Sequence, residues 1–74
     1  MKTAESVLKK ARANNEPVLV LRAQDECAAE AIYIYFRDCE YSGCSKKHTS
    51  EILKIYNDFR KWQMENPFRM KLPD

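Results

Sequence analysis

Residues 25–43 read DECAAEAIYIYFRDCEYSG, and this stretch decides the fold that we expect. Its apolar side chains recur at helical spacing and form one face. That face comprises Ala28, Ile32, Tyr35, Phe36 and Cys39. Ala31 and Ile34 widen it, so we expect this helix to be the central one. Asp25 is the expected N-cap because its carboxylate can accept a hydrogen bond from a free first-turn amide. Gly43, the only glycine of the chain, is the expected C-terminal cap because glycine tolerates a positive φ.

A second helical pattern follows and covers about residues 46–66. Ser45 is its expected N-cap, and Asn66-Pro67 ends it. Its apolar positions fall on one stripe, which consists of Ile52, Ile55, Tyr56, Phe59 and Trp62. Two amphipathic helices joined by a short turn predict a helical hairpin.

The flanking segments predict one further helix and two short strands. Residues 4–13 have a helical pattern that Thr3 can cap and that Asn14-Asn15-Glu16-Pro17 ends. The run Pro17-Val18-Leu19-Val20-Leu21 is apolar and rich in β-formers, which favours a buried strand. Residues 68–72 alternate strictly between apolar and polar, a period-2 strand pattern. We therefore expect a single small α+β domain over 1–74, mostly helical and ordered α-β-α-α-β, with the hairpin packed on a two-stranded antiparallel element.

Composition narrows the class of protein. The chain has 74 residues, and 13 Lys+Arg against 11 Asp+Glu leave a net charge of +2, so electrostatic binding to nucleic acid is not favoured. No apolar run reaches the roughly 18–20 residues that span a bilayer, and no apolar signal core follows the start of the chain. Three cysteines are an odd number, which fits reduced thiols in the cytoplasm better than a disulfide framework.

Four residues invite a metal hypothesis, because Cys27, Cys39, Cys44 and His48 have a spacing that loosely fits a CCCH zinc finger. Zinc needs ligands that converge on one point, whereas a helix between Cys27 and Cys39 would separate them by about 18 Å. A reduced set of Cys39, Cys44 and His48 stays open but is not favoured, so we expect no metal and no cofactor.

Cys44 and His48 could also form a nucleophilic pair at a helix N-terminus, where a thiol pKa falls. Such a site needs a pocket and an oxyanion stabiliser, which so small a chain with one glycine offers little room for. No phosphate-binding Gly-rich loop or nucleophile elbow is present. We therefore expect a protein that is not an enzyme.

Large apolar side chains exceed what one face of a hairpin can hide, and such a surplus indicates a contact surface. The expected interface residues are Tyr33, Phe36, Arg37, Tyr41, Tyr56, Arg60 and Trp62. We predict self-association, most simply as a two-fold homodimer. We also predict that Trp62 is mainly structural and anchors the C-terminal segment against strand 18–21. The alternative is nucleic-acid binding by basic side chains, namely Arg37, Lys46, Lys47, Arg60 and Lys61.

Three short motifs carry a resemblance. PVLVLRAQD at 17–25, WQxxNP at 62–67 and KLPD at 71–74 resemble small uncharacterised proteins encoded in tailed phages and prophages. The resemblance covers about residues 16–74. It implies a bacterial cytoplasm during infection and a helical hairpin with an extended segment in front of it. A small module in that setting would suit an inhibitor of a host protein or a sponge for a signalling nucleotide. The resemblance assigns no catalytic residue.

Overall fold

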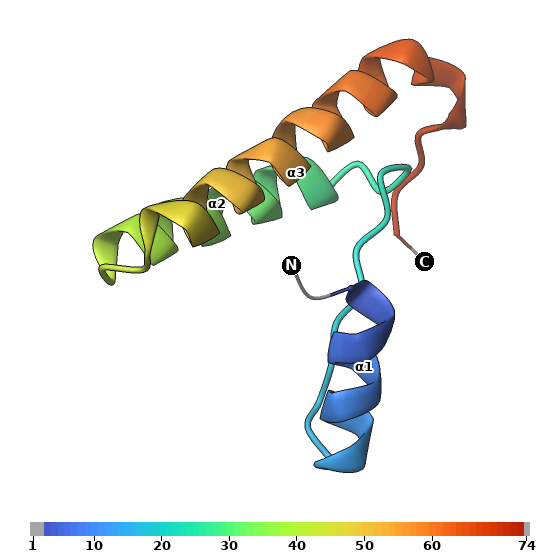
Figure 1. The fold of residues 1–74 in the computed structure, drawn as a ribbon. Coiled ribbons are helices and arrows are strands. Elements are labelled where there is room, and N and C mark those ends of the chain that lie inside the picture. The colour runs from blue at the N-terminus through green and yellow to red at the C-terminus, as the bar shows by residue number, and fades with distance from the viewer. Residues whose placement is uncertain (1–2, 74) are drawn as a thin grey trace.

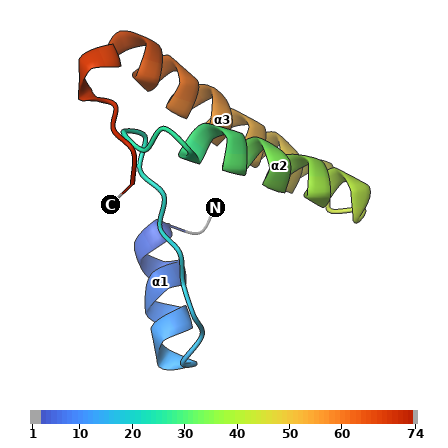
Figure 2. The same ribbon diagram turned by 180° about the vertical axis from the view of Figure 1, so that it is seen from behind.

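The computed structural model describes residues 3–73, and the described chain consists of three α-helices followed by one 3-10 turn. The elements are α1 (Ala4–Ala13), α2 (Ala28–Tyr41), α3 (Lys46–Glu65) and η1 (Pro67–Arg69). Helices α2 and α3 run side by side in opposite directions, while α1 stands apart from them (Figure 1). The view from behind shows the same separation (Figure 2).

The turn of the hairpin is closed by two caps that the sequence predicts correctly. Gly43 has a φ of 80°, the left-handed conformation that costs glycine nothing. The Gly43 amide donates to Glu40 O at 3.2 Å and the Cys44 amide donates to Cys39 O at 3.0 Å, the bond pair of a Schellman motif. On the other side of the turn, Ser45 Oγ accepts from the His48 amide at 3.2 Å. Both helix ends at the turn are therefore satisfied locally.

The start of α2 differs from the sequence prediction. Asp25 does not cap the helix, because α2 begins at Ala28 and its N-cap, Cys27, makes no side-chain capping bond. Asp25 Oδ1 instead accepts from the Cys27 amide at 2.7 Å, which makes a side-chain turn just before the helix. An aspartate followed by apolar residues is compatible with a helix N-cap and with a side-chain turn, and Asp25 forms the turn.

The expected α+β fold is wrong, because the described residues contain no strand and no sheet. The segment expected as a buried strand, 17–21, is an extended connection, and Val18, Leu19 and Val20 are exposed. Asn15 has a φ of 56° and reverses the chain, and the Glu16 amide then donates to Ala11 O at 2.9 Å. The extended segment therefore runs back along α1 (Figure 1), away from the C-terminal segment with which it was expected to pair.

The C-terminal segment 68–72 is also not a strand. Its first part is taken into η1, whose first residue, Pro67, has a fixed φ that suits a helical start. A single parallel bridge then joins Lys71 to Asp25, with the Glu26 amide donating to Lys71 O at 3.0 Å and the Lys71 amide to Gln24 O at 2.9 Å. The contact therefore has a different partner and the opposite direction from the expected antiparallel pair.

The hairpin contact is built from small side chains. Ala28, Ala29 and Cys39 of α2 are buried, and so are Thr49 and Ile52 of α3. Small side chains let the two backbones approach closely, but they remove little apolar area from water. Within residues 3–73 no large side chain is fully buried.

Gln63 holds the N-terminal loop of α2 onto α3. It is the other buried polar side chain of the hairpin, and its Nε2 donates to Ala23 O at 3.1 Å and to Asp25 O at 3.5 Å. The Gln63 side chain thus gives the carbonyls of Ala23 and Asp25 a hydrogen-bond donor. In the expected sheet, a neighbouring strand would have supplied such donors. None of the described helices is long and apolar enough to cross a membrane.

Helix α1 begins as predicted, because Thr3 Oγ1 accepts from the Ser6 amide at 3.1 Å. It packs against neither α2 nor α3. The Glu16 amide of the extended segment that follows donates to Ala11 O, and on this helix Ala11 is buried and Leu8 is half-buried. We refer to α1 together with residues 14–20 as the arm.

Candidate interaction surface

The chain exposes far more surface than its mass requires. Its accessible area is 6408 Å², whereas a compact monomer of 8.7 kDa exposes about 4,700 Å². The excess is about 1,700 Å² on that scaling. The radius of gyration agrees, since it is 13.6 Å against about 11 Å for a compact domain of this length. The accessible area and the radius of gyration thus both show that the chain is less compact than a globular monomer of its size.

Much of the exposed area is apolar and lies on both parts of the molecule. On the arm, Leu19 is 81% exposed, and on α2 Ile34 and Tyr35 are each 54% exposed. The other large apolar side chains that remain exposed are Val7, Val18, Val20, Tyr33, Tyr41, Leu53, Ile55, Met64, Phe68 and Leu72. Sequence reasoning missed Val18, Leu19 and Val20 because it assigned 17–21 to a buried strand.

Three of the expected interface residues come together on one side of the hairpin. The Tyr33 ring lies 6.0 Å from the Phe36 ring and 5.2 Å from the Tyr56 ring, measured between centroids. Both pairs are tilted, a favourable geometry for aromatic contacts. Phe36 and Tyr56 are half-buried and Tyr33 remains partly exposed. This cluster links α2 to α3 and leaves one phenol ring accessible.

Trp62 lies at the other end of the hairpin, where α3 meets η1. The Arg69 guanidinium stands over the indole, 4.9 Å from the ring centroid, and Asn66 Nδ2 donates to Trp62 O at 2.8 Å. Trp62 therefore contacts the C-terminal segment, as predicted, although there is no strand at 18–21 to anchor it against. Its indole also lines an open pocket of about 390 Å³ with Leu21, Arg22 and Phe59. We call this the indole pocket.

The remaining interface candidates do not join either group. Tyr41 is 95% exposed at the C-terminal end of α2. Arg37 is exposed on α2, and Arg60 is exposed on α3.

The basic side chains of the nucleic-acid alternative are spread along the hairpin. Lys46 and Lys47 occupy the first turn of α3, while Arg60 and Lys61 lie near its other end, about 20 Å away at the helical rise. Arg37 belongs to α2. The five cations thus form no single patch.

Tyr35, Cys39, Cys44 and His48 gather near the turn of the hairpin. The Tyr35 and His48 rings meet edge to face with centroids 6.4 Å apart. A hydrogen bond with Cys39 raises the pKa of the Tyr35 phenol, and burial adds to this. Desolvation raises the pKa of the Cys44 thiol, and a hydrogen bond with Cys39 raises it further. The pKa of the Cys44 thiol is therefore shifted upward, whereas its place near a helix N-terminus favours a lowered thiol pKa.

These side chains do not form a metal centre as placed. Among residues 3–73 no three His, Cys, Asp or Glu side chains stand close enough to hold an ion. Cys39 is buried, while Cys44 and Cys27 are exposed. The helix expected between Cys27 and Cys39 is present, because α2 runs from Ala28 to Tyr41.

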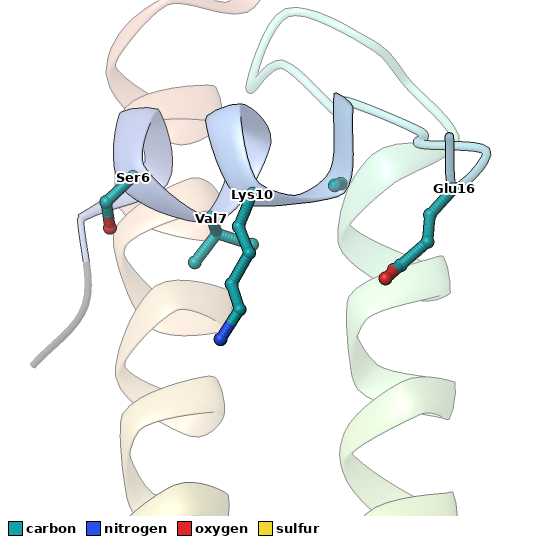
Figure 3. A pocket seen from close by; sticks show the side chains of 5 residues that line it. Ser6, Val7, Lys10 and Glu16 are labelled. Atoms are coloured by element: carbon teal, nitrogen blue, oxygen red, sulfur yellow. The ribbon is translucent and has the colours of Figure 1, made fainter. Parts of the chain in front are cut away.

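A groove on the arm was not anticipated. It measures about 270 Å³ and is lined by Val7 and Ala11 together with Ser6, Lys10 and Glu16. The Lys10 and Glu16 side chains extend in the same direction, and Val7 lies beside Lys10 (Figure 3). The arm groove forms because the chain reverses at Asn15, which has a positive φ. The reversal brings Glu16 back to α1, where its amide donates to Ala11 O. We call this the arm groove.

Comparison of the chain with protein-family models, with curated proteins and with solved structures finds no match.

Proposed function

We propose that the chain is a non-enzymatic interaction module that works as a homo-oligomer, most simply a two-fold dimer. The observation that carries the proposal is the excess accessible area. An obligate homodimer covers about 1,000–2,500 Å² per partner, and the excess of about 1,700 Å² per chain lies within that range. A second copy would therefore supply the apolar contacts that the small-residue hairpin lacks.

Light scattering of the purified chain tests this proposal. The expected mass at micromolar concentration is a multiple of 8.7 kDa, most simply twice that value, and it should fall on dilution. A mass of 8.7 kDa at every concentration up to the hundreds of micromolar would reject self-association. High salt serves as the control, because contacts that are mainly apolar should persist or strengthen in it.

We further propose that the module acts in a bacterial cytoplasm as a phage-encoded accessory protein that binds or inhibits a host component. The support is the short-motif resemblance, together with a surface rich in apolar side chains and poor in catalytic geometry. Pull-down from infected cells with the wild-type chain tests it. The matched control is a Tyr33→Ser variant, because Tyr33 is the accessible ring of the aromatic cluster. A partner retained equally by both would place the binding surface elsewhere, and recovery of no partner would count against the proposal.

A specific feature favours a second candidate, the binding of a small nucleotide. Arg22 and Arg69 flank the indole pocket, and within the described residues neither guanidinium pairs with a carboxylate. Guanidinium groups suit phosphate and an indole suits a base. Trp62 is the only tryptophan of the chain, so its fluorescence should report binding. Addition of AMP or a cyclic dinucleotide should change the emission of the wild type and not that of Arg22→Gln. An unchanged emission with both ligands removes this candidate.

A further inference from the structure

The arm groove has a polarity that specifies what can fill it. Two apolar side chains, Val7 and Ala11, line it together with Ser6 and two side chains of opposite charge, Lys10 and Glu16. A complementary knob is an aliphatic side chain with a carboxylate on one flank and a cation on the other. The volume of the arm groove, about 270 Å³, is ample for one aliphatic side chain.

Helix α2 presents such a knob on its solvent side. Ile34 is 54% exposed, and one turn later Arg37 and Asp38 stand on its two flanks, three and four residues along the helix. Both are exposed, and within residues 3–73 the ion pair between Lys54 and Asp58 involves neither. The neighbours one turn before Ile34 are Glu30, a further exposed carboxylate, and Ala31, which is small enough to let another helix approach.

The net charges of the helices point to the same pairing. Helix α1 has three basic residues and one acidic residue, so its charge is +2. Helix α2 has three acidic residues and one basic residue, so its charge is −2. In α3 five basic residues outnumber three acidic ones. Helix α2 is therefore the acidic helix of the three and the electrostatic complement of α1.

We propose that Ile34 of a second copy fills the arm groove, with Asp38 of that copy facing Lys10 and Arg37 facing Glu16. The inference rests on the proposed self-association and specifies its surface. In a two-fold dimer the contact occurs twice, because each arm then lies on the partner's α2. Within one chain α1 packs against neither α2 nor α3, so both halves of the contact are available to a second copy.

The first experiment is a charge exchange followed by sedimentation equilibrium. Lys10→Glu and Asp38→Lys should each weaken self-association about threefold to tenfold, because an attraction becomes a repulsion at two equivalent sites. The double variant Lys10→Glu with Asp38→Lys should return to within about twofold of the wild type. Both substitutions lie at exposed positions, and circular dichroism checks that all three variants keep their helicity. Failure of the double variant to recover overturns the pairing.

A second experiment removes the knob. Ile34→Glu should weaken self-association about tenfold or more, because a charge would enter an apolar groove. Met64→Glu is the matched control: Met64 is 75% exposed on α3, and its substitution should change the association constant less than about twofold. Equal effects of both substitutions overturn the proposal.

A third measurement locates the contact directly. In a mixed sample of labelled and unlabelled chains, the Val7 and Ile34 methyl groups should show an intermolecular nuclear Overhauser effect. A dimeric sample without this signal contradicts the pairing while self-association stands. A sample that is monomeric at every concentration contradicts the proposed function itself.

Discussion

The hairpin and the arm are both amphipathic, but they differ in what closes them. In the hairpin, Gly43 and Ser45 satisfy the backbone at the turn, and Gln63 bonds the preceding loop to α3. In the arm, a helix of ten residues meets only the extended segment that follows it. A helix of that length is marginal in water without tertiary packing. The comparison teaches that local capping sets where helices begin and end, whereas the burial of apolar side chains decides how stable each helix is.

The largest expected effect tests the hairpin contact. Ile52→Ala removes the largest of its buried apolar side chains and should lower the free energy of unfolding by about 2–4 kcal/mol, the usual cost of such a deletion. Urea titration followed by circular dichroism measures it. The arm supplies the control, because Leu8→Ala alters a half-buried side chain and should cost less than half as much in dilute solution. Equal losses would mean that the arm and the hairpin unfold as one body.

The next effect concerns the turn between α2 and α3. Gly43→Ala should destabilise the chain by about 1 kcal/mol, because a φ of 80° is strained for a residue with a Cβ atom. A Cβ atom there would meet nothing within 4 Å, so the cost is purely conformational. Gly43→Asn is the sharper control, since asparagine tolerates the left-handed region, and it should lose less. If alanine and asparagine cost the same, left-handed strain does not set the cost.

A pair of cap substitutions compares the two regions directly. Ser45→Ala should lower the thermal midpoint of the hairpin, at a cost of about 1 kcal/mol, because His48 loses its capping acceptor. Thr3→Ala removes the equivalent bond from α1. In dilute solution, where the chain is monomeric, it should reduce helicity without moving the main transition. Hydrogen exchange of the Ser6 and His48 amides follows each region separately. In dilute solution, a common shift of both amides in either variant would contradict the separation of arm and hairpin.

The smallest expected effect is at Cys44. Desolvation and the hydrogen bond with Cys39 raise its pKa in the folded chain. The folded state therefore favours the protonated thiol, so this contribution to stability is complete at neutral pH and below. It is lost as pH rises through the alkaline pKa of the folded thiol. Iodoacetamide should accordingly modify Cys44 more slowly in the folded chain than in urea at neutral pH. A faster reaction in the folded chain would show that the thiol is activated instead.

The sequence was informative wherever a local rule acts alone. Helical spacing and the caps Thr3, Gly43 and Ser45 placed all three helices, and the start of α2 was misplaced only because Asp25 forms a turn rather than a cap. The strands were wrong for a tertiary reason. A run of β-formers such as 17–21 needs a partner to become a strand, and the reversal at Asn15 directs it along α1 instead.

The candidate site was only partly predictable for the same reason. Tyr33, Phe36 and Tyr56 meet as neighbours across two helices. Periodicity placed Phe36 and Tyr56 on the apolar faces of their helices, but it left Tyr33 outside the expected face. The arm groove depends on a positive φ at Asn15 and on a hydrogen bond between Glu16 and Ala11. Neither feature can be predicted from the spacing of apolar residues. The exposure of Leu19 likewise depends on the path of the whole chain, which gives segment 17–21 no partner strand among the described residues, and the local sequence does not predict it.

The thermal midpoint as a function of protein concentration tests most directly whether a second copy covers the excess surface. If the folded state is completed by association, mass action stabilises it and the midpoint rises as concentration increases. We predict a rise of several degrees between the low micromolar and the hundreds of micromolar range. A midpoint that stays constant over that range would show that the single chain, with its 6408 Å² exposed, is already the complete folded unit.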